Sequence, residues 1–173
     1  DGRLYALDVR TGALHWSSSS QSRFGGHGRF YSTPALAYGR VYIGSTDGKV
    51  YSFGAATGEL RWSQSTGGYV YSSPAVWNRT VYAGSYSRDL VALDAATGVE
   101  RWRFRANGPI SGSPTVMAGQ VWFATLSRRT YVLDARTGRQ VWTFPDGEYT
   151  PLAADADRPY LVGYARVYAL RPS

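Results

Sequence analysis

The sequence predicts an all-β fold of repeated four-stranded antiparallel units, and three observations lead to that prediction. A motif recurs four times and ends on a tryptophan, at positions 16, 62, 102 and 142, so that the spacings are 46, 40 and 40 residues. A Ser/Thr–Pro landmark recurs in step with it, with prolines at 34, 74, 114 and 151. No window carries an apolar stripe at helical spacing. A period of about 40–45 residues that holds four short strands is that of a β-propeller blade.

The second unit shows how the strands are expected to follow one another. Strands are predicted over residues 31–37, 40–45, 49–53 and 59–63, and we name them A to D in chain order. The Thr-Gly pair at 57–58 suits a turn that needs a positive φ angle. At the same turn of three other units an aspartate, Asp8, Asp94 or Asp134, is expected to accept the N–H groups of the turn.

The repeats assign the whole chain, residues 1–173, to one partial propeller. Full blades are predicted over 31–63, 71–104 and 110–144, with blade fragments at 1–16 and 149–170, which together make 17 strands. If these strands closed into a ring of four blades, residues 4–7 and residues 167–170 would both have to be strand C of the same blade. We therefore expect an open arc whose missing blades lie upstream. The alternatives are two copies that complete one ring, or self-association through the open sheet edges.

The composition limits the classes of partner and of chemistry. Apolar residues make up 43% of the 173 residues, and the net charge is +7. A positive surface favours an anionic partner, such as an acidic protein or an anionic envelope polymer, although it also serves solubility. No nucleic-acid recognition motif is present, so no specific nucleic acid is expected. The absence of cysteine excludes disulfides and thiolate metal sites, and no apolar run is long enough for a membrane span.

The repeated motif resembles that of a known family. The pattern Ala-x-Asp-x-x-Thr-Gly-x-x-x-Trp, together with Ser-x-Pro and Val-Tyr-x-Gly-Ser (residues 41–45 and 81–85), resembles the tryptophan-docking motif of pyrroloquinoline-quinone (PQQ) repeat propellers. That family includes quinoprotein alcohol dehydrogenases, the BamB-type lipoprotein and other extracytoplasmic repeat proteins. The resemblance implies a C-terminal partial ring of about four blades from a seven- or eight-bladed propeller. It also implies an extracytoplasmic location and a structural role between blades for Trp16, Trp62, Trp102 and Trp142. The motif is broken at Gly54, which replaces the aspartate.

No catalytic, cofactor-binding or metal-binding residue is expected in this chain. The resemblance implies that catalytic members of the PQQ-repeat family hold PQQ and Ca²⁺ in the central channel, often beside a disulfide of adjacent cysteines. This disulfide cannot form here, because the sequence has no cysteine. The motif aspartates already have a role in their turns. His15 lies where sister repeats carry arginine, and Asp155 and Asp157 fall on a predicted turn. PQQ with calcium remains an alternative if the ligands lie in upstream blades.

The remaining candidates are surface residues at the end of the sheets where the D–A and B–C connections lie. The first D–A connection is six residues longer than the others, and insertions in repeats often mark a binding face; a tolerated loop is the alternative. Partner-binding candidates are therefore Arg23, Phe24, His27, Arg29, Phe30, Arg88, Arg128 and Arg129. The leading hypothesis is a non-catalytic extracytoplasmic scaffold or sensor domain that binds a protein or polymer. The alternative is part of a PQQ-dependent quinoprotein dehydrogenase.

Overall fold

The computed structural model describes residues 2–21, 28–149, 152–154 and 159–170 and contains only β-strands as regular elements. In chain order they are β1 (Arg3–Leu7), β2 (Leu14–Ser19), β3 (Ala35–Ala37), β4 (Arg40–Gly44), β5 (Lys49–Gly54), β6 (Leu60–Ser65), β7 (Ala75–Trp77), β8 (Thr80–Gly84), β9 (Asp89–Asp94), β10 (Glu100–Arg105), β11 (Thr115–Met117), β12 (Gln120–Thr125), β13 (Arg129–Asp134), β14 (Gln140–Phe144), β15 (Leu152–Ala154), β16 (Pro159–Val162) and β17 (Val167–Ala169). No helix long and apolar enough to cross a bilayer occurs in the described part of the chain.

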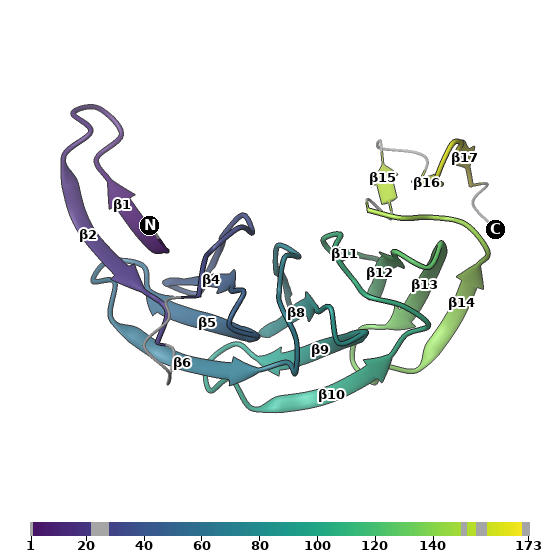
Figure 1. Cartoon of the computed structure of the whole chain (residues 1–173), viewed down its shortest axis with the longest axis horizontal. Helices are drawn as coiled ribbons and strands as arrows, with labels where there is room; N and C mark the ends of the chain where they lie inside the picture. The colour runs from purple at the N-terminus through teal and green to yellow at the C-terminus, as the bar shows by residue number, and fades with distance from the viewer. Residues whose placement is uncertain (1, 22–27, 150–151, 155–158, 171–173) are drawn as a thin grey trace.

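The strands form five antiparallel sheets. Within each sheet, strands that are neighbours in space are also consecutive in the chain. Three sheets have four strands (β3–β6, β7–β10 and β11–β14), while β1–β2 form a pair and β15–β17 a three-stranded sheet. The sheets follow one another along an arc, with β6, β10 and β14 on its outer rim (Figure 1). In the described residues β1 pairs only with β2, and β17 only with β16, so the arc is open. The predicted all-β partial ring of four-stranded blades is confirmed.

Strand A is shorter than the sequence predicts. The prediction was residues 31–37, whereas β3 begins at Ala35. Pro34 has no N–H to give to a ladder, and side chains replace the ladder before it. The Ser32 hydroxyl accepts the N–H of Gly44 at 3.0 Å, and the N–H of Thr33 donates to Ser73 Oγ of the next blade at 2.8 Å. This segment therefore ties two blades together instead of extending one strand.

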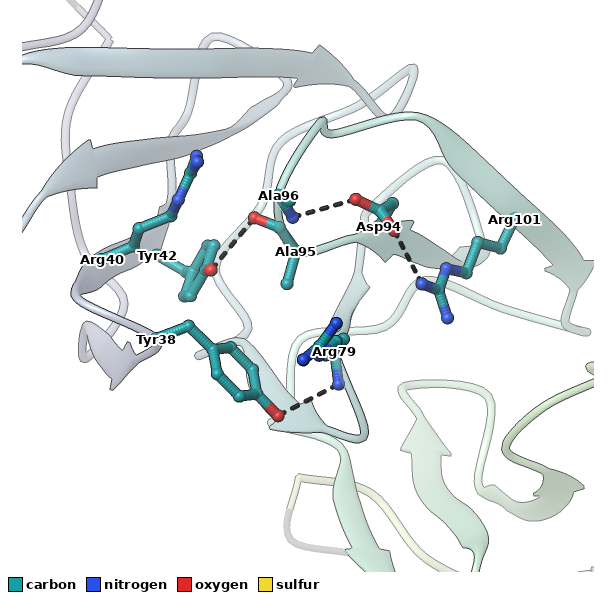
Figure 2. A pocket seen from close by; sticks show the side chains of 8 residues that line it. All are labelled: Tyr38, Arg40, Tyr42, Arg79, Asp94, Ala95, Ala96 and Arg101. Carbon is teal, nitrogen blue, oxygen red and sulfur yellow. Dashed lines mark hydrogen bonds and ion pairs between the residues drawn. The ribbon is translucent and has the colours of Figure 1, made fainter.

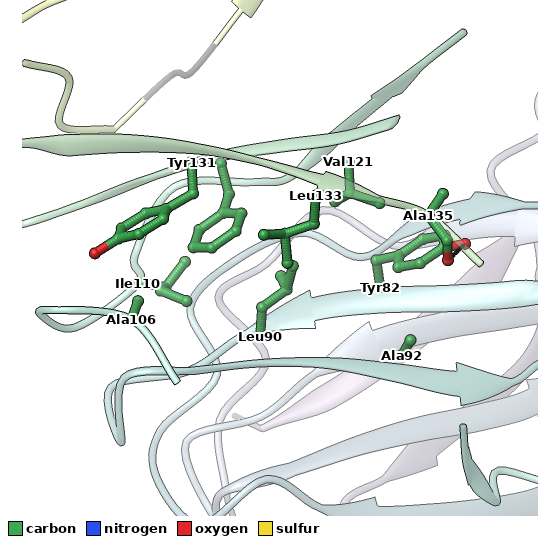
Figure 3. Packing of buried hydrophobic residues seen from close by; sticks show 10 residues of the cluster. Tyr82, Leu90, Ala92, Ala106, Ile110, Val121, Tyr131, Leu133 and Ala135 are labelled. Atoms are coloured by element: carbon green, nitrogen blue, oxygen red, sulfur yellow. Dashed lines mark hydrogen bonds between the residues drawn. The ribbon is translucent and has the colours of Figure 1, made fainter. Parts of the chain in front are cut away.

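The hydrophobic core lies between blades. In the cluster that joins the β7–β10 and β11–β14 sheets, Tyr82 and Leu90 of one sheet meet Val121 and Leu133 of the other, with Ile110 from the connection between them (Figure 3). Most of these side chains are fully buried. A four-stranded sheet buries an apolar face only when another element packs on it, so each blade depends on its neighbours.

Three of the four strand D tryptophans reach the next blade. The indole N–H groups of Trp16, Trp62 and Trp102 donate to the carbonyls of Ala55, Ala95 and Ala135 at 3.0, 3.1 and 3.1 Å. The structural role between blades that the sequence predicts requires Trp62, Trp102 and Trp142 to be largely buried. Trp62 is 8% exposed, Trp102 is half-buried, and the prediction is wrong for Trp142, which is 37% exposed. The residue that would match Ala135 in the last blade falls within 171–173, outside the described residues.

Candidate partner-binding face

The D–A connections and the B–C turns meet at one end of the sheets, and we call this end the loop face. Arg29 and Thr46 bond each other there, because the N–H of Thr46 donates to the Arg29 carbonyl at 3.0 Å and Thr46 Oγ1 accepts the N–H of Arg29. In the next blade the N–H of Tyr86 donates to the Tyr69 carbonyl at 2.9 Å. The backbone of these two D–A connections is thus fixed against a B–C turn.

Two arginines occupy strained positions at the tips of these turns. Arg88 and Arg128 have φ angles of 74° and 54°, at the position where the preceding blade has Gly48 at 83°. A side chain in this left-handed region costs about 1–2 kcal/mol, and such positions are found preferentially at functional sites. Both arginines are exposed, so the two turn tips carry cationic side chains that solvent reaches.

The structure places the partner-binding candidates from the sequence in different situations. Arg23, Phe24 and His27 lie outside the described residues. Arg29, Arg88, Arg128 and Arg129 are exposed and take part in none of the ion pairs found in the described part of the chain.

Phe30 is turned towards the protein interior instead. Its ring is half-buried and meets Tyr51 and Phe53 edge-on, with centroid distances of 5.8 and 6.3 Å. Much of its surface is therefore used in packing within the blade.

The loop face also carries a group of tyrosines, which we call the tyrosine cluster: Tyr31, Tyr69, Tyr71 and Tyr86. The sequence places Tyr31 and Tyr71 at the starts of the predicted blades 31–63 and 71–104, but it did not predict that they meet Tyr69 and Tyr86. Tyr71 is the centre, with ring centroids 5.7, 6.2 and 5.0 Å from those of Tyr31, Tyr69 and Tyr86. Tyr31, Tyr69 and Tyr86 are 58%, 56% and 38% exposed. Arg29 borders the cluster, since its Nη1 donates to the Tyr31 hydroxyl at 3.1 Å. The available signal was the occurrence of Tyr69 and Tyr86 in predicted connections instead of strands.

A second feature of the loop face joins the last two sheets. The Arg128 guanidinium lies 3.8 Å from the ring centroid of Tyr164, a geometry that fits a cation–π contact. Asp146 lies beside them in a pocket of about 260 Å³ and accepts the N–H groups of Tyr164 and Gly147 and the hydroxyl of Tyr168. These hydrogen bonds, with that from Tyr164 first, lower the pKa of the Asp146 carboxyl. The carboxylate is held in place by the chain itself.

Other charges near this face are paired within the protein. Asp89 is buried, and its carboxylate meets Arg103 and Arg105 at 3.1 Å each. Arg103 also pairs with Glu100 at 2.6 Å. Arg105 therefore differs from Arg29, Arg88 and Arg128, which take part in none of the ion pairs of the described residues.

The motif aspartates act in their turns as predicted. One oxygen of Asp94 accepts the N–H groups of Ala96 and Thr97 and the Thr97 hydroxyl at 2.9–3.0 Å. Asp8 and Asp134 make the same three contacts in their own turns. The Arg101 guanidinium and these turn donors lower the pKa of Asp94 to about 2. Across the described residues, no group of three or more His, Cys, Asp or Glu side chains is arranged to hold a metal ion.

Together, the open arc of four-stranded blades, the Trp-to-carbonyl contacts and the repeated turn motif define a β-propeller built from PQQ-like repeats. The family described as outer membrane protein assembly factor BamB matches residues 1–85 and 70–172. The chain belongs to this family. A search of curated proteins finds no match.

Solved structures show the same fold. BamB from Moraxella catarrhalis superposes with a TM-score of 0.78 at 24% identity, over 98% of this chain and 52% of that one. Quinohemoprotein alcohol dehydrogenase ADHIIG from Pseudomonas putida HK5 gives 0.67 at 23% identity, over 75% of this chain and 28% of that one. The computationally designed Ika8 protein gives 0.83 at 16% identity, covering 99% and 53%. This chain thus spans about half the length of the Moraxella protein.

Proposed function

We propose that this chain is part of a non-catalytic extracytoplasmic scaffold that binds a protein or an anionic envelope polymer through the loop face. The tyrosine cluster with Arg29 at its border carries the proposal. Tyrosine and arginine are enriched at protein interfaces, because each combines a large contact area with hydrogen-bonding groups. Family membership supports the extracytoplasmic location, since the family description names a factor in outer membrane protein assembly.

The electrostatics of the loop face favour an anionic partner. Arg88 and Arg128 project from turn tips in a backbone conformation that favours glycine. Both residues are exposed, and guanidinium groups are suited to bidentate contacts with carboxylates or phosphates. The tyrosine rings beside Arg29 add apolar contact area, so the partner should present acidic groups next to apolar ones.

Matched charge reversal tests the proposal. Arg29→Glu/Arg88→Glu changes the loop face, and Arg10→Glu/Arg136→Glu makes the same charge change on exposed residues at the opposite end of the sheets. Partners are recovered with the intact protein from the envelope fraction of the native cells. We expect the loop-face variant to lose the partner and the other variant to keep it, and added salt to weaken the wild-type complex. Loss only with the second variant would overturn the assignment.

Tyr86→Ala separates an aromatic contact from charge attraction. If the tyrosine cluster is the contact, this variant loses the partner without any change in net charge. Equal loss from both charge-reversal variants, with no effect of Tyr86→Ala, would indicate non-specific attraction and contradict the proposal.

A separate binding experiment tests the alternative that the chain is part of a PQQ-dependent dehydrogenase. Titration of the intact protein with PQQ and Ca²⁺, followed by tryptophan fluorescence, should give no saturable binding if the scaffold proposal holds. Saturable micromolar binding would instead favour the quinoprotein dehydrogenase and replace the scaffold as the leading function.

A further inference from the structure

A pocket of about 410 Å³ lies between the β3–β6 and β7–β10 sheets, at the end opposite the loop face. The first sheet contributes Arg40 on β4 and the second contributes Arg79 and Arg101 (Figure 2). A volume of this size is in the range of small-ligand sites, about 300–1,000 Å³. The pocket is thus large enough for a small molecule and is bordered by three arginines.

The pocket carries an excess of positive charge. Arg101 pairs with Asp94, with Nη2 and Oδ2 2.7 Å apart, and also donates to Thr80 Oγ1 at 2.8 Å. Three guanidinium groups and one carboxylate leave a net charge of 3 − 1 = +2. In the described residues, no carboxylate pairs with the side chain of Arg40 or Arg79. The two uncompensated positive charges favour the binding of an anion.

Arg79 occupies a backbone position that favours glycine. Its φ angle is 57°, and the equivalent turn residues of the neighbouring blades are Gly39 at 67° and Gly119 at 74°. The three are equivalent because each carbonyl accepts the N–H of an alanine in its own blade, at 2.9–3.0 Å. The strain of an arginine in this region is not needed to form the turn, since glycine forms it twice. A strained residue at a pocket points to a functional role.

Arg40 provides a second, independent observation. Its Nη1 atom is buried and has no hydrogen-bond partner among the residues that the structure describes. A buried donor without an acceptor is costly and rare in folded proteins. An oxyanion in the pocket would supply the acceptor once the Arg40 guanidinium turns towards it, since Nη1 has almost no exposed surface in this structure. Tyr42, which shares the pocket, does not, because its hydroxyl donates to the Ala95 carbonyl at 3.0 Å.

The next junction of the arc lacks this arrangement. By the repeat register, Arg40, Arg79 and Arg101 correspond there to Thr80, Gly119 and Val141. The arginine triad is therefore not a requirement of the repeat fold, which packs well at the next junction without it.

We propose that this pocket binds a small oxyanion, a phosphate group or a dicarboxylate, between Arg40 and Arg79. Guanidinium groups bind the paired oxygens of either anion in a bidentate geometry, and a dianion would neutralise the net charge of the pocket. Tyr38, whose hydroxyl accepts the N–H of Arg79 at 3.1 Å, fixes the turn that carries this arginine. This site goes beyond the proposed function and lies on the other end of the sheets, so the two can fail separately.

Titration of the intact protein with inorganic phosphate and, separately, with succinate tests the proposal. The ionic strength is held constant with sodium chloride, and the ¹⁵N–¹H resonances of the arginine Nε groups are followed. We expect saturable shifts for Arg40 and Arg79 with at least one of the two anions. Binding of phosphate alone, or of succinate alone, assigns the chemical class; absence of saturable binding with both overturns the proposal.

Arg79→Gly is the decisive variant, because it restores the residue that the sister turns carry. Its thermal unfolding midpoint should be equal to or higher than that of the wild type, while the affinity for the anion should fall at least tenfold. Arg136→Gln is the matched control, since it removes an exposed arginine from the next blade at the same end of the sheets. The control should bind within twofold of the wild type. Wild-type affinity in Arg79→Gly would overturn the proposal.

Discussion

Tyr42 and Trp62 donate hydrogen bonds to the same carbonyl oxygen, that of Ala95 in the next blade, at 3.0 and 3.1 Å. Their ring centroids are 5.8 Å apart. The relationship repeats one blade later, where Tyr82 and Trp102 both donate to Ala135 at 2.9 and 3.1 Å. At both junctions, two aromatic side chains from one blade thus bind one turn of the neighbouring blade.

Trp62→Ala should destabilise the protein strongly. The side chain is 8% exposed and joins the inter-blade core, and removal of a large buried aromatic group costs about 3–5 kcal/mol. The midpoint of urea unfolding measures the effect. Trp142→Ala is the control, because this side chain is 37% exposed and should cost clearly less. Equal losses would contradict the inter-blade role of Trp62.

Gly98→Ala should destabilise more than Gly39→Ala, although both glycines have positive φ angles, 76° and 67°. A Cβ atom at position 98 would lie 2.6 Å from Trp62 Cδ2, whereas nothing lies within 4 Å at position 39. Gly39→Ala should therefore cost only the backbone strain, about 1–2 kcal/mol. Thermal unfolding of both variants makes the comparison, and equal midpoints would show that the close approach of the tryptophan ring carries no cost.

Stability should fall in acid in a way that depends partly on Asp94. Its folded pKa of about 2 lies below the unfolded value of about 4. The lowered pKa stabilises the fold fully above pH ~4, and this contribution disappears as the pH falls towards ~2. Urea midpoints between pH 6 and pH 2 should show this loss. Asp94→Asn should be less stable at pH 6 and lose less on acidification. An unchanged acid slope in this variant would contradict the assignment, while the lowered pKa values of Asp8 and Asp134 leave part of the slope in place.

Asp89→Asn should destabilise by about 1–3 kcal/mol, because a buried carboxylate that accepts charged hydrogen bonds is lost. Asp89 is 7% exposed at its side chain and meets both Arg103 and Arg105. Glu100→Gln removes the more exposed partner of Arg103 and should cost less than about 1 kcal/mol. Chemical unfolding of the two variants gives the comparison, and the reverse order would place the main ion pair at Glu100.

The repeat period predicted the blade architecture from the sequence, but the sequence did not predict the roles of several side chains. The Thr-Gly turn was predicted from its conformational need, and the structure adds that Gly98 must also leave room for Trp62. Phe30 was assigned to the binding face from its place in a connection, yet its ring packs against Tyr51 and Phe53. A local pattern does not tell on which side of a connection a ring will lie.

By itself, the sequence determined the number and order of the strands, the antiparallel blades and the aspartate turns, because these depend on contacts between residues close in the chain. Only the tertiary structure brought Arg40 and Arg79 to one pocket and Tyr31, Tyr71 and Tyr86 to one cluster. Residues about 40 positions apart become neighbours when one blade packs on the next. Which of them meet depends on the angle between the sheets and on how the side chains fill the space between them.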